Sequence, residues 1–213
     1  MWQFISDRWQ DVAFRSYQHV SLVIQSVILA MIIAMAVAVL VTTYRRLEPV
    51  ANAISSVGLT IPSFALLGLV LPLVGIGAVP SVIVVTFYAT LPILRNAVVG
   101  LDGVDKALVE SARGMGMSTI RVFFRVRLPL AWPVTLAGLR VSTQMSMGVA
   151  AIAAYALGPG LGAYIFTGLT QIGGANALNY TLVGTIGVVI LALILDALLL
   201  LLGRVTISRG IRV

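Results

Sequence analysis

Long apolar runs alternate with short polar links along this chain. Each run reaches the roughly 20 residues that a helix needs to cross about 30 Å of hydrocarbon. Such runs occupy residues 20–42, 50–73, 79–100, 134–157 and 180–203. The pattern therefore predicts an all-α, polytopic membrane protein with about five transmembrane helices packed as one bundle.

The three middle runs are less regular than the first and last. They contain Pro62, Pro72 and Pro92 together with several glycines. A spanning helix tolerates these residues when neighbouring helices or a cavity satisfy the freed backbone groups. We therefore expect the middle helices to face other helices or a cavity rather than lipid.

Residues 1–19 precede the first apolar run. Trp2, Phe4 and Trp9 are separated by polar residues, and no short apolar core is followed by a cleavage site of small residues. The pattern favours a short interfacial helix on the external side over a signal peptide.

Composition agrees with a membrane protein and removes several kinds of chemistry. The chain is 60% hydrophobic and 10% charged, with a mean hydropathy of +1.07, whereas soluble proteins carry about a quarter charged residues. It contains no cysteine, and His19 is its only histidine. Thiol chemistry, a histidine metal cluster and Ser-His catalysis are therefore excluded within this chain, and we expect neither catalytic residues nor metal ligands.

The net charge of +7 follows the expected topology. With five spans, most basic residues fall in links on one side, which the positive-inside rule assigns to the cytoplasm. We expect an external N-terminus and a cytoplasmic basic tail at 204–213, and we expect no nucleic-acid partner. The basic residues on that side are Arg45, Arg46, Lys106, Arg113, Arg121, Arg125, Arg127, Arg204, Arg209 and Arg212.

The long cytoplasmic link, residues 101–133, has a helical order of its own. Helix formers follow Asp102 and Asp105, either of which can cap a helix. Gly114 and Gly116 then break or turn that helix.

A second helix is expected after this glycine turn. Apolar residues from Ile120 onward recur at helical spacing between arginines. Pro129 and Pro133 are expected to end that helix and to start the next span. A loop that served only the positive-inside rule would need no such order.

The motif in this link resembles a known family. Glu110-Ser111-Ala112 is followed by three residues, Gly116, nine residues and Val126-Arg127-Leu128-Pro129. This is similar to the EAA loop of binding-protein-dependent ABC importer permeases, which reads Glu-Ala-Ala, three residues, Gly, nine residues, Ile, any residue, Leu-Pro. Ser111 replaces the first alanine and Val126 replaces the isoleucine, with the spacing intact.

The resemblance covers about residues 20–203, as one type I ABC importer permease domain. Several further segments look like the osmoprotectant branch, which moves glycine betaine, carnitine, choline and related quaternary ammonium compounds. The alternative is a permease of the same fold for another small, amino acid-like solute. The segments are Thr60–Gly68, Leu71–Gly77, Leu91–Asn96, Gly114–Met117 and Gly158–Gly162.

The resemblance implies that residues 107–116 form a coupling helix docked on a cytoplasmic ABC ATPase subunit. Glu110 would meet a basic residue of the ATPase or act as a cap; the alternative is an intrahelical pair with Lys106 or Arg113. Gly116 would provide a sharp turn with positive φ. The full set of coupling residues is Glu110, Ser111, Ala112, Gly116, Val126, Leu128 and Pro129.

The resemblance also implies partners. Lys106, the only lysine, does not follow a P-loop, so ATP and magnesium are expected on the separate ATPase and no cofactor is expected in this chain. A second permease chain, identical or similar, and an extracytoplasmic substrate-binding protein are expected as well. The complex would lie in the cytoplasmic (inner) membrane of a bacterium or archaeon.

A charged residue lies inside the last apolar run. Asp196 is costly there unless it is paired, and Arg140 and Arg95 are the candidate partners. The pair would set helix register, or alternatively serve as a proton relay.

Pathway and gate residues are expected in the middle spans. Aromatic faces attract quaternary ammonium groups, so Phe64, Phe87, Tyr88 and Tyr155 could form a weak cage, or alternatively pack within the bundle. Methionines give an adaptable lining suited to a gate or to the core. The candidates are Pro62, Phe64, Tyr88, Gln144, Met145 and Met147.

Three other classes remain as alternatives. An ion-coupled secondary transporter would use Asp196, but the chain shows no convincing inverted repeat. An intramembrane enzyme would need a catalytic pair that the apolar runs lack. A structural scaffold would explain a docking link but not the spans that contain proline.

Overall fold

The computed structural model describes residues 1–208 and 210, and helices account for almost all of that part of the chain. No strand occurs among the described residues, which confirms the all-α prediction. Arg209 and Arg212 of the expected basic tail lie outside the described residues. The elements are α1 (Trp2–Thr43), η1 (Arg45–Leu47), α2 (Glu48–Thr60), α3 (Ser63–Val74), α4 (Ala78–Asp102), α5 (Lys106–Gly114), α6 (Thr119–Val122), η2 (Phe123–Arg127), α7 (Leu128–Ala153), η3 (Ala154–Ala156), α8 (Gly162–Thr170) and α9 (Ala177–Thr206).

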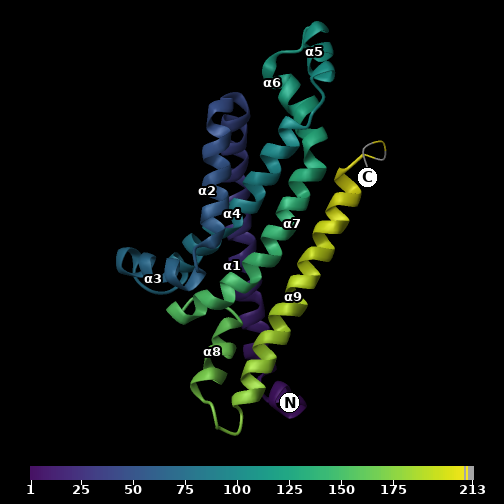
Figure 1. Cartoon of the computed structure of the whole chain (residues 1–213). Helices are drawn as coiled ribbons and strands as arrows, with labels where there is room; N and C mark the ends of the chain where they lie inside the picture. The colour runs from purple at the N-terminus through teal and green to yellow at the C-terminus, as the bar shows by residue number, and fades with distance from the viewer. Residues whose placement is uncertain (209, 211–213) are drawn as a thin grey trace.

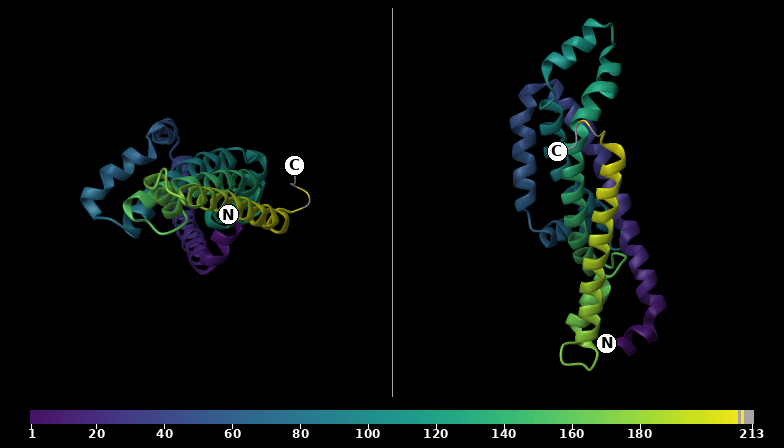
Figure 2. Two further views of the ribbon diagram at one scale, coloured as in Figure 1. Left: turned by 90° about the horizontal axis from the view of Figure 1, so that it is seen from below. Right: turned by 90° about the vertical axis from the view of Figure 1, so that its right-hand side faces the viewer.

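The long helices α1, α4, α7 and α9 run lengthwise through an elongated bundle (Figure 1). Helices α5 and α6 project beyond them at one end, and the last turn of α9 points toward that end. The N-terminus and α8 lie at the opposite end, as the two further views confirm (Figure 2). Among the described residues, four helices are long and apolar enough to span a membrane, or five if the bent pair α2–α3 counts as one span.

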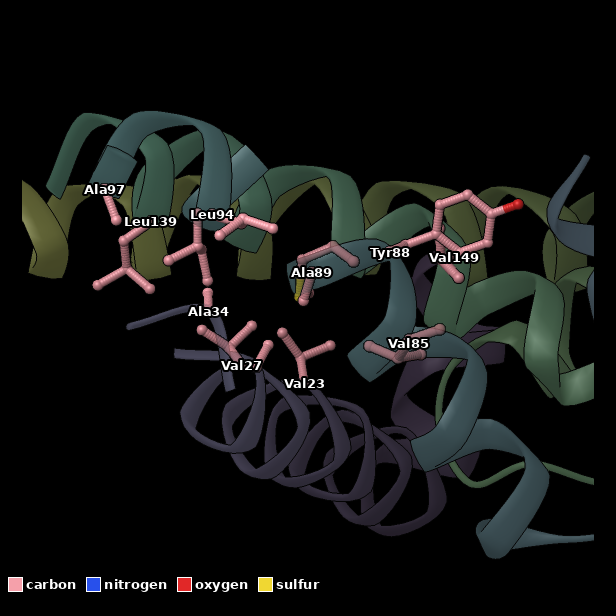
Figure 3. Packing of buried hydrophobic residues seen from close by; sticks show 14 of the residues in the cluster. Val23, Val27, Ala34, Val85, Tyr88, Ala89, Leu94, Ala97, Leu139 and Val149 are labelled. Carbon is pink, nitrogen blue, oxygen red and sulfur yellow. The ribbon is translucent and has the colours of Figure 1, made fainter. Parts of the chain in front are cut away.

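Small residues bring α1 against α4 and α7. Ala30, Ala34 and Ala38 recur every fourth residue on α1 and are fully buried, so they form a stripe along one face. In a membrane, helices associate through close packing rather than through the hydrophobic effect, and small side chains permit that approach. Figure 3 shows side chains of the three helices meeting in this core, among them Val23, Ala34, Val85, Ala89, Leu139 and Val149.

The antiparallel pair α4–α7 is the tightest contact in the bundle. A Cβ placed on Gly138 would lie 2.5 Å from Cβ of Asn96, so only glycine fits there. The hydroxyl of Ser142 donates to the carbonyl of Ala89 at 2.6 Å. These contacts hold α4 and α7 in one register.

The second apolar run is not one straight helix, contrary to the expected span 50–73. Helices α2 and α3 meet at 97°, because Pro62 adopts an extended conformation after Ile61 and proline cannot donate within a helix. The buried Tyr88 of α4 donates its hydroxyl hydrogen bond to the Ile61 carbonyl, which the break leaves without a helical partner. The rest of α3 projects sideways from the bundle (Figure 1).

The short helix predicted in residues 1–19 is confirmed only for residues 2–7, which a kink at Arg8 separates from the rest of α1. Residues 9–19 continue without a break into the first span. Phe4 is buried against Tyr164 and Tyr180, and the Tyr164 hydroxyl donates to Asp11 at 2.7 Å. Packing against α8 and α9 thus extends the helix beyond the apolar run.

Pro129 and Pro133 do not end a helix, contrary to expectation. Helix α6 passes through the π-helical turn η2 directly into α7, with Pro129 at its second position and Pro133 inside it. Proline at position 129 removes the donor that the Arg125 carbonyl would otherwise use. The wider π-turn lies at this point and lets the chain continue without a break.

Candidate functional site

The α5–α6 hairpin carries the motif residues of the long link. Asp105 caps α5, since its Oδ1 accepts a hydrogen bond from the Ala107 N–H at 2.8 Å. Of the two expected caps the structure uses Asp105. Ser118 caps α6 in the same way, accepting from the Arg121 N–H at 3.4 Å.

The glycine turn between the helices has the expected conformation. Helix α5 ends at Gly114, and Gly116 has a φ of +82°, a region that residues with a Cβ rarely adopt. The Gly116 N–H donates to the Arg113 carbonyl at 2.9 Å, and the Met117 N–H donates to the Ala112 carbonyl at 3.2 Å. These bonds close the end of α5 and reverse the chain.

The motif residues of α5 divide between a buried and an exposed side. Ala112 is buried in the hairpin, while Glu110 and Ser111 are exposed. Glu110 forms no ion pair within residues 1–208, so the intrahelical pairs with Lys106 and Arg113 are not formed. Its carboxylate is therefore available to a partner.

A polar cavity of about 390 Å³ lies between α5 and the bundle. Two contacts close its base: the Arg127 guanidinium donates to the Leu101 carbonyl at 3.3 Å, and Arg45 lies 3.7 Å from Asp102. The Arg127 contact ties η2, which follows the hairpin, to the end of α4, and the Arg45 contact ties η1 to the same end of α4. The cavity is lined by Thr42, Arg45, Leu101, Asp102, Val104, Lys106, Val109, Glu110, Arg113 and Arg127.

The last part of the motif lies where the hairpin joins α7. Val126 and Leu128 are half-buried and Pro129 is exposed. Leu128 and Pro129 line an apolar groove with Trp132, between α1 and α7. The motif thus runs from the exposed tip of the hairpin to the start of a spanning helix.

Asp196 pairs with Arg140 rather than with Arg95. Arg140 Nε and Nη2 donate to the two carboxylate oxygens at 2.8 and 2.9 Å, a bidentate pair between α7 and α9. Gln144, one helical turn after Arg140 on α7, is exposed. The structure fits a contact that sets the register of these helices.

Arg95 lies instead on a face of the bundle that no described helix covers. Because α1 packs against both α4 and α7, helical geometry places the exposed residues of these two helices on the side opposite α1. We call this side the open face. It comprises Arg95 and Val99 of α4 and Val134, Val141 and Gly148 of α7, all exposed.

The pathway candidates occupy different environments. Met147 is buried in the core and Met145 is half-buried. Tyr88 is buried, and its hydroxyl serves the backbone at the α2–α3 break. Pro62 and Phe64 are exposed beside that break.

The expected aromatic cage forms only in part. Phe64 and Tyr155 pack together with ring centroids 4.7 Å apart, and Tyr155 lies 5.6 Å from Phe166. Phe87 and Tyr88 contact each other elsewhere, edge to face at 5.4 Å. Sequence reasoning missed Phe166, because nothing in the spacing of α8 indicates which way that ring points.

Within residues 1–208 and 210, no three histidine, aspartate or glutamate side chains lie close enough to share a metal ion. The charged contacts described above are ion pairs or line the polar cavity.

Comparison with known proteins confirms the resemblance to binding-protein-dependent importer permeases. The profile of the family described as "binding-protein-dependent transport system inner membrane component" matches residues 26–207. The chain is 35% identical to the choline transport system permease protein OpuBB of Bacillus subtilis, covering 99% of this chain and 95% of that one. It is 36% identical to the osmoprotectant import permease protein OsmW of Salmonella typhimurium, covering 98% of each.

The fold is also found among solved structures. A chain of the MetNI methionine ABC transporter in an inward-facing conformation superposes with a TM-score of 0.73, covering 95% of this chain and 96% of that one. The two sequences are 24% identical. This likeness concerns the arrangement of helices.

Proposed function

This chain belongs to the family of binding-protein-dependent transport system inner membrane components, and from that membership we propose that it is the permease subunit of an ATP-driven importer of a quaternary ammonium osmoprotectant. Glycine betaine, carnitine and choline are the solutes of this class. The relatives described above support the class, since two of them are named for choline and osmoprotectant transport. A small amino acid-like solute is the alternative.

The observation that carries the proposal is the α5–α6 hairpin. It stands beyond the spanning helices (Figure 1), keeps the motif spacing and leaves Glu110 exposed without an ion pair. A helix that protrudes with a free carboxylate suits docking into a second protein. In the proposed complex that protein is the ABC ATPase, which binds ATP and magnesium.

The hairpin is joined to the spans stiffly enough to transmit motion. On one side α6 continues through η2 into α7, and on the other Arg127 of η2 donates to the Leu101 carbonyl near the end of α4. When the ATPases close on ATP, a rigid displacement of α5 would therefore tilt α7 and α4 together. Rigid-body rocking of this kind produces alternating access.

The remaining partners follow from the surfaces. The open face is the proposed contact with a second permease, identical or similar, and the solute path would run between the two chains. The external binding protein would dock at the end that carries α8 and the N-terminus, which places α5, α6 and the end of α9 in the cytoplasm. Residues 20–203 would form the transport domain in the inner membrane, with 1–19 external and 204–213 cytoplasmic.

Reconstitution of the whole complex tests this proposal. Proteoliposomes that contain the permease, its ATPase and the binding protein should take up labelled betaine, carnitine or choline only with ATP inside. Glu110→Arg should reduce uptake and solute-stimulated ATP hydrolysis at least tenfold, because the reversed charge faces the basic residue expected on the ATPase. Glu48→Arg, at the start of α2 and outside the hairpin, is the matched control and should retain both.

Two results would contradict the proposal. Uptake that ignores ATP and collapses with the proton gradient would identify an ion-coupled transporter. Unchanged coupling in Glu110→Arg would remove the hairpin from the ATPase contact.

A further inference from the structure

Three aromatic rings on the external half of the bundle form one contact group that stays partly exposed. Phe64 at the start of α3, Tyr155 in η3 and Phe166 in α8 come from three separate segments; Tyr155 contacts the other two rings, with centroids 4.7 and 5.6 Å apart. Phe64 is 50% exposed and Tyr155 is 58% exposed. The group therefore differs from the other exposed rings of the chain in bringing several faces together at one accessible place.

The group lies where solute would arrive from outside. Helix α2 has 13 residues, so the break before α3 lies about 20 Å from the hairpin end of the bundle. Figure 1 shows α3 crossing beside the end of α7, with α8 next to it and away from α5 and α6. The rings are thus in the outer part of the protein, on the proposed path from the binding protein.

The three rings are inclined to one another rather than stacked. Phe64 and Tyr155 are tilted by 57° to each other, and so are Tyr155 and Phe166. A cation is attracted to an aromatic face within about 6 Å of the centroid. With neighbouring centroids closer together than that, one trimethylammonium group can contact more than one ring.

The surroundings contain no competing charge. Residues 61–79 and 154–179, which supply all three rings and their flanks, include no Asp, Glu, Lys or Arg. No charge from these segments would compete with the ring faces for a cation. The carboxylate of a zwitterionic solute such as betaine would likewise meet no like charge from them. Such a site would bind choline and betaine alike, because its contacts are with the trimethylammonium group that they share.

We infer that Phe64, Tyr155 and Phe166 form a transient binding site in the permease for the quaternary ammonium head of the solute. The inference rests on the proposed function, because it takes the solute class from it. The site receives the cationic head when the binding protein releases the solute. It binds weakly enough to let the solute pass inward.

The electronic character of the rings tests this site. Fluorine withdraws electron density from a ring face while hardly changing its size, so it weakens a cation contact but not packing. Mono-, di- and trifluorophenylalanine would be incorporated at position 64 and, in place of Tyr155, at position 155, in the reconstituted complex. The rate of choline uptake would be measured at a saturating concentration of loaded binding protein.

We expect the uptake rate to fall stepwise with each fluorine, by roughly fivefold over the series. The same series at Phe14, an exposed ring on α1, should have no effect. Tyr155→Phe, which keeps the ring face, should remain near wild type. Efflux or exchange of 3,3-dimethylbutanol, the uncharged isostere of choline, should not depend on fluorination.

The outcomes separate the two proposals. If the unmodified complex imports choline or betaine but the fluorine series is flat at positions 64 and 155, the aromatic site is wrong and the importer stands. If the series at Phe14 declines equally, the effect is not local and the site is likewise wrong. If the unmodified complex imports no quaternary ammonium compound, the proposed solute class fails and the site fails with it.

Discussion

Single residues decide which of several plausible contacts forms. Asp196 had two candidate arginines, and the structure pairs it with Arg140 across 56 positions of sequence. Arg95 lies one helix away on the open face instead. Both arginines have the same chemistry, so only the rotation of α4 and α7 about their axes separates a paired from an unpaired charge.

The Arg140–Asp196 pair should matter most when only one partner is removed. Asp196→Ala leaves the guanidinium of Arg140 uncompensated between two spans, so we expect a loss of about 3 kcal/mol in the free energy of unfolding. The double variant Arg140→Met with Asp196→Leu removes both charges and should unfold close to wild type. Denaturant unfolding in one detergent, monitored by circular dichroism, gives the free energy of unfolding of the single and the double variant. Equal losses of stability in the two variants would show that an uncompensated charge is not the cause.

Gly160 makes a second contact that only the tertiary structure reveals. A Cβ there would lie 2.5 Å from Nδ1 of His19, whose ring is fully buried and whose Nε2 lies 3.2 Å from the Met147 carbonyl. The only histidine of the chain is therefore a packing residue between α1, α7 and the loop before α8. Its spacing in the sequence indicates none of this.

At the scale of elements, the hairpin was predicted well and the boundaries of the spans less so. Capping and glycine preferences act within a few residues, so Asp105 and the positive φ of Gly116 follow from local sequence. The continuity of α6 into α7 does not follow from local sequence, because a proline is compatible with both a break in the helix and a π-helical turn. The 97° bend at Pro62 depends on Tyr88, which belongs to another helix.

The turn at Gly116 should tolerate substitution according to backbone conformation alone. No atom lies within 4 Å of a Cβ built at this position, so any cost comes from φ = +82°. We expect Gly116→Val to reduce ATP-driven uptake several-fold and Gly116→Asn to retain most of it, since asparagine accepts this region more readily.

Gly114→Ala provides the matched control. Gly114 is the last residue of α5, has no positive φ and has open space around it. Alanine there should leave uptake unchanged or slightly improve stability. If the Val and Asn variants at position 116 lose the same amount of uptake, or if Gly114→Ala loses as much, the positive φ of Gly116 is not what uptake depends on.

At the scale of the whole molecule, three exposed features fit the proposed assembly with partner proteins. The hairpin, the open face and the sideways helix α3 each point away from the core formed by α1, α4 and α7. Their exposed apolar side chains, such as Val141 at 55% and Leu73 at 81%, would otherwise lie against lipid together with the charge of Arg95. A second permease against the open face would separate that charge from hydrocarbon.

Photo-cross-linking tests this arrangement for an identical or a similar partner. Benzoylphenylalanine at Val141, on the open face, should yield a product of about twice the permease mass on irradiation of the assembled complex in membranes. The same probe at Ile32, which is 63% exposed on α1, should give no permease–permease product. Equal products at both positions would contradict the assignment of the open face.

The sequence by itself determined the membrane class, the number of apolar spans, the hairpin motif and the likeness to one permease family. These properties are local or one-dimensional: apolar length sets what can cross a bilayer, and caps, glycines and prolines act on their neighbours. Only the tertiary structure decided that residues 9–19 continue into the first span after a kink at Arg8, that Arg140 rather than Arg95 meets Asp196, and that Phe64, Tyr155 and Phe166 come together. Each of these depends on the rotation and register of helices distant in sequence, which are set by packing between small side chains such as Ala34 and Gly138.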